Sequence, residues 1–247
     1  MNYNYRLNSF INRAINFFKP KSTILPANIE DILDNNKGLN IVEKFSDLYY
    51  QSRGQMEWRG SNLIKNPCDL FTLIDLLGKL KPGLIIETGT AEGGSALFMR
   101  DMLDLLNIDC QIVTIDVNPK WGVNPLEKGI SSFVGTSTDQ NIYKQVKDIA
   151  HKVKESGRHI LVTLDSDHSE KNVSEELSLY SPLVTVGSYC IVEDTNVNGH
   201  PSFSNHGPGP WEAAQKFIKL NDNFVIDNSM QNYLLTFNPD GYLKRIY

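Results

Sequence analysis

The chain has 247 residues, of which 40% are hydrophobic and 21% charged, and its formal net charge at pH 7 is −5. These proportions are ordinary for a globular protein, and the length suits one large α/β domain. The acidic balance disfavours a nucleic-acid-binding surface, because such surfaces need a basic excess to displace counterions. No apolar run reaches the roughly 18 residues of a membrane-spanning helix.

The N-terminal residues 1–27 are expected to form a helical appendage that ends in the turn-prone stretch KPKSTILPAN. Polar residues interrupt its apolar core, which argues against a signal peptide. We expect this helix to dock on the domain or on a second copy of the chain, giving a homo-oligomer. The alternative is a weak peripheral contact with a membrane surface through residues 1–20, without a membrane span.

Residues 28–80 carry apolar side chains at three- and four-residue spacing, which predicts helices. These helices open a single domain that spans residues 28–247. The last of them, DLFTLIDLLGKLKPG, has Asp69 as its expected N-cap and stops at Pro82 and Gly83.

After Pro82 the pattern alternates between apolar strands and helices. Strands are expected at LIIET, QIVTIDV, FVG, HILVTLDS, SYCIVEDT, FVID, NYLLTF and YLKRI. Apolar strands joined through helices predict a doubly wound, mostly parallel sheet, a Rossmann-like α/β fold. The last two strands, joined by a turn at residues 238–241, predict a C-terminal antiparallel hairpin.

The number and spacing of the cysteines indicate which cellular compartment suits the protein. Cys68, Cys110 and Cys190 are scattered, odd in number and without metal-binding spacing. They predict no disulfide framework and favour a reducing, cytoplasmic location.

The stretch IIETGTAEGGSAL joins the first strand of the sheet to a helix through a glycine turn. Glu87 precedes the first glycine, where its carboxylate would repel a diphosphate but attract an ammonium group. Asp116, at the end of the next strand, is suited to hold ribose hydroxyls, although those of NAD would serve equally. An ammonium-bearing nucleoside without phosphate is S-adenosylmethionine. The alternative is that Glu87 is a structural acid satisfied by local amides.

A second group of acids follows two later strands. Asp165, Glu193 and Asp194 should converge at one edge of the sheet, and like charges in that position need a cation. Oxygen ligands of this kind suit Mg²⁺, with Mn²⁺ or Ca²⁺ as substitutes. Asp167 is either a fourth ligand or an orienting partner. His168 is placed to take a proton from a bound hydroxyl, the alternative being an exposed first-turn residue.

At this point the chain resembles the cephalosporin hydroxylase / rhamnosyl O-methyltransferase family over roughly residues 40–247. The resemblance rests on the ordered motifs EKFSDLYYQ, WRGSNLIKNPCDL, LIIETGTAEGGSALFMRDML, VTIDV, GTSTD, LDSDHS, SPLVTVGSYCIVEDTNVNG, GPGPWEA and LLTFNPDGYLKRI. It implies a class I, S-adenosylmethionine-dependent and usually Mg²⁺-dependent O-methyltransferase.

The resemblance also implies roles for individual positions. Cofactor contacts fall on the glycine turn, on the ribose-binding acid and beside the adenine, and metal ligation on the acids. The implied cofactor residues are Glu87, Gly89, Thr90, Gly93, Ser95, Asp116, Thr136 and Ser137; the metal ligands are Asp165, Glu193 and Asp194, and the catalytic residues are His168 and Asp165. Thr136 stands where an acid is commoner in the family.

The expected reaction is methylation of a hydroxyl on a small molecule, such as a sugar of a glycolipid, glycan or natural product. The loop over residues 196–211 is placed to cover this acceptor, and Trp211 either stacks on it or packs the following helix. Three alternatives stay open: a non-haem metal oxygenase, an NAD-dependent reductase and a catalytically silent S-adenosylmethionine-binding protein. An oxygenase would need two histidines and one carboxylate, and the missing G-x-G-x-x-G argues against a reductase.

Overall fold

The computed structural model describes residues 42–46, 49, 56–122, 124–231, 233 and 235–247. The chain divides into two units, Met1–Val42 and Glu43–Tyr247, and the elements below belong to the second unit. The expected appendage over residues 1–27, with its contacts to a membrane surface or a second copy, lies outside the described residues. Residues 42–46 are helical, as expected.

Apolar strands build a seven-stranded sheet in the described part of the chain, in the order β5-β4-β3-β6-β7-β9-β8. Five neighbouring strands are parallel: β5 (Ile130–Val134), β4 (Gln111–Asp116), β3 (Leu84–Thr88), β6 (Ile160–Leu164) and β7 (Tyr189–Val192). β9 (Tyr242–Arg245) runs antiparallel to both β7 and β8 (Phe224–Ile226). The strand order reverses between β3 and β6, which is where such sheets form a ligand crevice.

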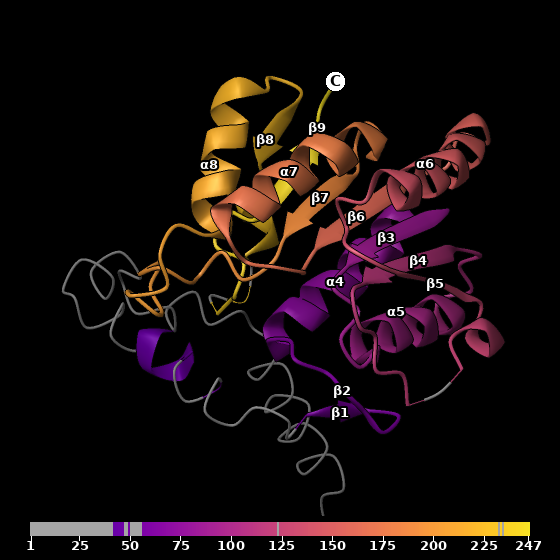
Figure 1. The fold of residues 1–247 in the computed structure, drawn as a ribbon, viewed down its shortest axis with the longest axis horizontal. Helices are drawn as coiled ribbons and strands as arrows, with labels where there is room; N and C mark the ends of the chain where they lie inside the picture. Colours follow the sequence, from indigo (N-terminus) through magenta and orange to yellow (C-terminus); the bar gives the residue numbers. More distant parts are fainter. Residues whose placement is uncertain (1–41, 47–48, 50–55, 123, 232, 234) are drawn as a thin grey trace, which may run out of the picture. The chain divides into compact units, whose positions relative to one another are not determined.

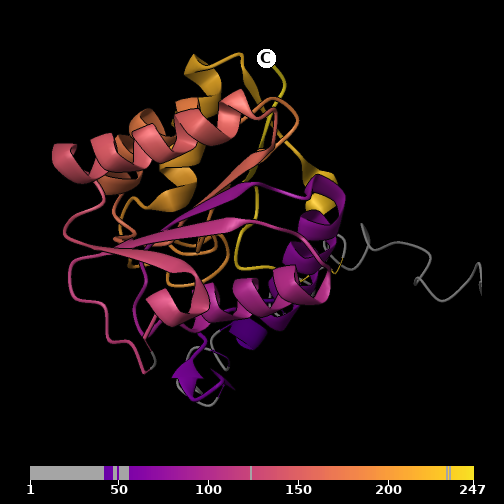
Figure 2. The ribbon, with the colours of Figure 1, turned by 90° about the vertical axis from the view of Figure 1, so that its right-hand side faces the viewer.

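Helices cover both faces of the sheet, as Figures 1 and 2 show. α6 (Gln140–Glu155), α7 (Glu170–Tyr180) and α8 (Pro210–Leu220) lie on one face, and α4 (Pro67–Leu80) and α5 (Gly94–Leu105) lie on the other. This three-layer arrangement confirms the expected doubly wound α/β fold.

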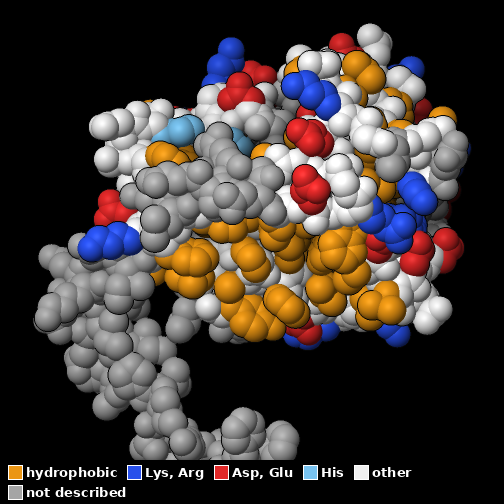
Figure 3. Space-filling view, turned by 90° about the horizontal axis from the view of Figure 1, so that it is seen from below, with side chains coloured by type: hydrophobic (Ala, Val, Ile, Leu, Met, Phe, Trp, Pro, Cys, Tyr) orange, Lys and Arg blue, Asp and Glu red, His pale blue; other side chains and the backbone are white. Residues whose placement is uncertain are grey.

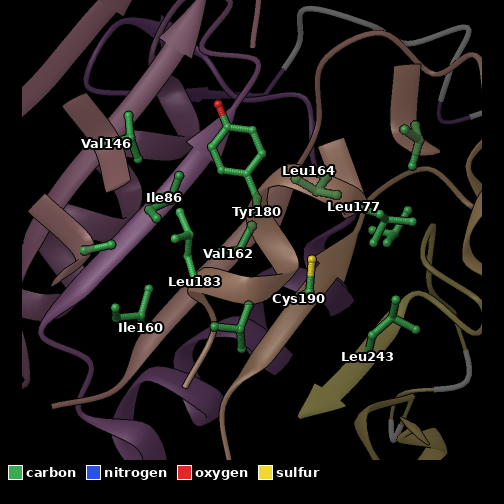
Figure 4. Packing of buried hydrophobic residues seen from close by; sticks show 14 of the residues in the cluster. Ile86, Val146, Ile160, Val162, Leu164, Leu177, Tyr180, Leu183, Cys190 and Leu243 are labelled. Atoms are coloured by element: carbon green, nitrogen blue, oxygen red, sulfur yellow. The ribbon is translucent and has the colours of Figure 1, made fainter. Parts of the chain in front are cut away.

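The core on the α6–α8 face shows why the strands read as continuous apolar runs. Side chains alternate along β3, so that Ile86 packs on this face while Ile85 packs on the α4–α5 face. Figure 4 shows Ile86 and Val162 from the sheet beside Tyr180 of α7. Because both faces are buried, both alternate sets of strand residues are mostly apolar.

Between the helical residues 42–46 and α4, where helix was expected, the structure has a short β-ribbon. β1 (Glu57–Trp58) pairs antiparallel with β2 (Ser61–Asn62) around Arg59 and Gly60. Both turn residues have positive φ, 53° and 78°. A two-residue loop with both residues left-handed matches the twist of an antiparallel pair, so the local turn overrides the helical spacing.

Two further expectations need correction. The N-cap of α4 is Asn66, whose side chain accepts from the Cys68 amide, and Asp69 lies inside the first turn. The described residues of the stretch NYLLTF are not in a strand; β9 pairs with β8 across a long connection. The expected antiparallel pair is present at the C-terminus, with a different first strand.

Part of the surface of the described residues is apolar. Figure 3 shows hydrophobic side chains gathered on the face seen from below. Phe71 of α4 and Tyr233 are 62% and 51% exposed, and their rings lie 6.3 Å apart. Among the described residues, no helix is long and apolar enough to cross a membrane.

Candidate active site

A cavity of about 530 Å³ opens at the carboxyl ends of β3, β4 and β6. Its lining combines loop backbone with carboxylates and an imidazole. The lining residues are Ile64, Gly89, Ala91, Ile115, Asp116, Val117, Gly135, Thr136, Ser137, Asp165, Ser166, Asp167, His168, Asn172 and Asp194. The cavity therefore lies where the strand order predicts a ligand site.

The glycine turn after β3 is required first by the protein's own packing. A Cβ on Gly89 would lie 1.9 Å from the Asp165 carbonyl oxygen, and one on Gly93 would lie 2.2 Å from the Trp121 ring. Both glycines have positive φ, 85° and 81°. Gly89 also lines the cavity, whereas Gly93 caps α5. The turn thus brings β3 against the end of β6, close enough for one ligand to contact both.

Asp116 ends β4 and faces the cavity, as expected of a residue that holds ribose hydroxyls. Its carboxylate accepts from the Ala91 amide at 2.8 Å and from the Asn118 amide at 2.7 Å. These two bonds hold it between the glycine turn and the loop after β4. A carboxylate has about four acceptor positions, so two amides leave room for a ligand's hydroxyls.

Glu87 lies behind the cavity rather than on its wall. The residue is 1% exposed, and its Oε2 accepts from Thr114 Oγ1 at 2.6 Å. Thr114 is also 2.6 Å from Thr90 Oγ1, while Ser95 bonds Glu87 directly. The second oxygen, Oε1, has no hydrogen-bond partner among the described residues. Burial raises the pKa of Glu87 to about 7, although the hydroxyl groups lower it.

Asp165, His168 and Asp194 meet at the other side of the cavity. One donor atom from each lies within 4.8 Å of the other two, and His168 Nε2 is 3.2 Å from Asp194 Oδ2. Burial raises the pKa of Asp165, while the neighbouring Lys65 lowers it. Two carboxylates and an imidazole in one small group fit a divalent cation. His168 precedes the N-cap of α7, Ser169, so it belongs to the loop and not to the helix.

Glu193, the third expected metal ligand, is not in this group of donor atoms and bonds to other residues. Its Oε1 forms an ion pair with Lys65 Nζ at 2.8 Å, and its Oε2 accepts from Asn238 Nδ2 at 2.6 Å. The Lys65 ammonium also bonds Asp165 Oδ2 at 2.8 Å. Burial lowers the pKa of Lys65, but the two carboxylates outweigh it and raise the value overall. Sequence reasoning missed Lys65, although it lies within the family motif WRGSNLIKNPCDL.

Asp167 does not belong to the donor group. Its Oδ1 accepts from the Ser169 amide at 2.8 Å, and this backbone bond lowers the pKa of Asp167. The carboxylate therefore shapes the turn before α7, which supports the orienting alternative over ligation.

Thr136 and Ser137 line the cavity near Asp116, with Thr136 exposed and Ser137 buried. The buried Glu176 of α7 bonds Ser137 and accepts from Ser166 Oγ at 2.6 Å. Glu176 thus bonds to two polar residues of the cavity wall, Ser137 and Ser166. Glu176 was also missed, because nothing in the helical spacing of α7 distinguishes it from a surface acid.

The loop after β7 is tied down by the start of α8. Glu212 accepts from Asn198 Nδ2 at 2.7 Å and from the Gly209 amide at 2.8 Å, and it lies 3.0 Å from His200 Nε2. Trp211 stacks on His200 at 4.0 Å and donates to Asp240 at 3.1 Å. These contacts favour packing over an acceptor-stacking role for Trp211.

The structure thus brings seven expected site residues to one cavity: Gly89, Asp116, Thr136, Ser137, Asp165, His168 and Asp194. Glu87, Thr90, Gly93, Ser95 and Glu193 are not among its lining residues. Glu87, Thr90 and Ser95 take part in the hydrogen bonds behind the glycine turn. Glu193 is linked to Asp165 through Lys65, which contacts both carboxylates.

Comparison with known proteins gives a consistent picture. The family model described as Rhamnosyl O-methyltransferase/CmcI matches residues 50–246. Rhamnosyl O-methyltransferase of Mycobacterium tuberculosis (strain ATCC 25618 / H37Rv) is 31% identical, covering 83% of this chain and 85% of the relative. The same enzyme of Mycobacterium leprae (strain TN) is 32% identical, with coverage of 83% and 91%.

Solved structures show the likeness of fold. A CmcI structure with Mg and SAM has 21% identity and a TM-score of 0.59, covering 78% of this chain and 77% of that chain. An apo structure of CmcI has 23% identity and a TM-score of 0.60, with coverage of 78% and 76%. At these TM-scores the two proteins share the fold described above.

Proposed function

This chain belongs to the Rhamnosyl O-methyltransferase/CmcI family as an S-adenosylmethionine-dependent O-methyltransferase, and we propose that its acceptor is a sugar hydroxyl group. The family and the class I fold expected from the sequence are confirmed. The cofactors of the reaction are S-adenosylmethionine and Mg²⁺. The acceptor is a hydroxylated small molecule, and the finer assignment to a sugar carried by a glycolipid, glycan or natural product is our proposal.

The observation that carries the proposal is one cavity lined both by Asp116 and by the group of Asp165, His168 and Asp194. Asp116 lies at the end of β4, and Asp165, His168 and Asp194 lie at the ends of β6 and β7. We assign Asp116 to the ribose hydroxyls, with Thr136 and Ser137 beside the adenine. Gly89 lets the ligand approach the main chain where β3 and β6 meet.

Glu87 is assigned a supporting role. Its carboxylate is buried and bonded to Thr114, so it braces the glycine turn from behind. The unpartnered Oε1 leaves one acceptor for an ammonium group that reaches past the turn. This assignment combines the two expectations for Glu87, a structural acid and an ammonium partner.

The acceptor hydroxyl is activated by Asp165, Asp194 and His168 in this proposal. Asp165 and Asp194 would bind Mg²⁺, and the bound ion would lower the pKa of an acceptor hydroxyl and fix its position. We assign His168 to taking the hydroxyl proton and not to binding the ion. Because its Nε2 lies 3.2 Å from Asp194 Oδ2, that contact orients the imidazole and leaves Nδ1 to accept the proton. Methyl transfer then needs only the oxygen in line with the donor methyl, which the shared cavity supplies.

A sugar suits this arrangement because neighbouring hydroxyls offer two oxygens to one hard cation. The relatives named rhamnosyl O-methyltransferases, at 31–32% identity, support the same acceptor class. A phosphorylated acceptor would bring negative charge towards three carboxylates, which disfavours it.

Calorimetric titration with S-adenosylhomocysteine tests the cofactor site, with wild type compared to Asp116→Ala. We expect loss of affinity of about 10- to 150-fold in the variant, because hydrogen bonds to a charged group contribute about 1.5–3 kcal/mol. NADH, titrated separately, should not bind. Methyl transfer from labelled S-adenosylmethionine to rhamnosides and other glycosides then tests the acceptor class.

Two outcomes would lead to other functions. Binding of S-adenosylhomocysteine without methyl transfer to any hydroxylated acceptor would favour a silent cofactor-binding protein. Iron-dependent oxidation of an acceptor would favour an oxygenase; the donor group found among the described residues, one histidine with two acids, is the reverse of the oxygenase pattern.

A further inference from the structure

Lys65 is the one basic side chain in the described part of the chain that contacts two of the three expected metal-binding acids. Its ammonium lies 2.8 Å from Asp165 Oδ2 and 2.8 Å from Glu193 Oε1. The residue is 8% exposed. A lysine is rarely buried without partners, so both ion pairs are needed to keep it inside the protein.

The backbone holds Lys65 in place. Its carbonyl accepts from the Tyr49 hydroxyl, and the next residue, Asn66, is the N-cap of α4. The side chain therefore reaches the acids from a fixed point at the start of a helix, and not from a mobile surface loop. A cation placed in this way is part of the site's construction.

The charges of the group balance only when Lys65 is counted. Asp165, Glu193 and Asp194 carry three negative charges when ionised, and Lys65 carries one positive charge. A divalent cation added to these four side chains gives a neutral group. Without Lys65, the same ion would meet a net charge of −3 in place of −2, and its attraction would be stronger.

We propose that Lys65 is a built-in counter-cation of the acid group, which holds Asp165 and Glu193 together and sets a moderate affinity for the divalent metal. Lys65 is a positioning residue, because it acts through the two carboxylates. The inference rests on the proposed function, in that the acid group is taken to bind Mg²⁺. It accounts for the contacts of Glu193, whose carboxylate is bonded to Lys65 and Asn238.

The test is Mg²⁺ titration by calorimetry of wild type, Lys65→Met and Lys65→Arg in the full chain. Methionine keeps much of the side-chain length and removes the charge, whereas arginine keeps the charge. We expect Lys65→Met to bind Mg²⁺ at least tenfold more tightly than wild type, and Lys65→Arg to stay within threefold of it.

Thermal unfolding supplies a readout that does not depend on activity. Without Mg²⁺, Lys65→Met should melt below wild type, because Asp165 and Glu193 repel each other. With saturating Mg²⁺, its melting temperature should rise by more than that of wild type. S-adenosylhomocysteine binding checks that the variant is folded, since Lys65 is not among the residues lining the cavity.

If Lys65→Met is too unstable to purify, Lys65→Gln is titrated in its place, since it can donate hydrogen bonds without a charge. Unchanged or weaker Mg²⁺ binding in the neutral variants would overturn the inference while leaving the proposed function intact. Tighter binding in Lys65→Arg as well would also overturn it, because space and not charge would be the cause. If neither wild type nor the neutral variants bind Mg²⁺, the proposed metal site itself fails, and the inference fails with it.

Discussion

Replacing Gly89 by alanine tests why the chain needs a glycine at the end of β3. At this position the backbone has φ of 85°, and an added Cβ would lie 1.9 Å from the Asp165 carbonyl oxygen. The left-handed conformation costs a non-glycine residue about 1–2 kcal/mol. Overpacking against backbone adds about 1–3 kcal/mol, so the variant should lose about 2–5 kcal/mol of stability.

Gly157 provides a matched control. It follows the C-cap of α6 with φ of 73°, and an added Cβ would have no described atom within 4 Å. Gly157→Ala should therefore carry only the conformational cost of about 1–2 kcal/mol. The difference between the two variants isolates the close approach of Gly89 to Asp165.

Urea unfolding of ligand-free protein measures both losses under identical conditions. Because the blocking atom belongs to the protein, the extra loss in Gly89→Ala should appear before any cofactor or metal is added. Equal losses in the two variants would refute the reasoning. The requirement for glycine would then come from the ligand, as in a turn that merely admits a cofactor to the main chain.

The remaining predictions concern a proton acceptor and a buried acid. His168→Ala should lower kcat by about 10²–10⁴-fold while affinity for S-adenosylhomocysteine stays unchanged; an unaltered rate in a methyl-transfer assay would exclude His168 as the base. Burial raises the pKa of Asp69 to about 6. The pKa of Asp69 is therefore higher in the folded protein than in the unfolded chain. The stability that its protonated carboxyl contributes to the folded protein is fully present below about pH 4 and is lost as the pH rises to about 6. Over that range wild type should lose about 3 kcal/mol relative to Asp69→Asn in urea unfolding, and a constant difference between the two proteins would contradict this.

The order of strands and helices could be predicted because it depends on local patterns. β3 begins with three apolar residues and is buried along its whole length, and α6 carries its buried residues at helical spacing. The positions of Asp116, Asp165 and Asp194 followed from one rule, that the carboxyl ends of parallel strands share an edge. The location of Asp165, His168 and Asp194 near one edge of the sheet was therefore predictable.

The contacts that these side chains make were not predictable, because they depend on residues from distant segments. Lys65 reaches Asp165 across 100 positions of sequence, and no periodicity of its own segment indicates that contact. The β1–β2 ribbon was missed because its turn, at Arg59 and Gly60, carries only one of the usual turn residues. Spacing identifies the strand end, while the partner of each carboxylate is decided by tertiary packing.

Two segments outside the parallel strands brace the acids. Asp69, in the first turn of α4, accepts from the Phe237 amide at 2.8 Å and from the Thr236 hydroxyl. The adjoining Asn238 accepts from the Asp194 amide at 2.9 Å and donates to Glu193 at 2.6 Å. Asp194 itself has a left-handed φ of 54°.

A non-glycine residue persists in that conformation only where its surroundings hold it. The start of α4 supplies Lys65 to the acids, and the segment before β9 supplies Asn238. Because Asp69 joins these two segments to each other, a change at either end should move the Glu193 carboxylate, which Lys65 and Asn238 both contact. The positions of Asp165, Glu193 and Asp194 therefore depend on the start of α4 and on the segment before β9 as much as on the strands that these acids follow.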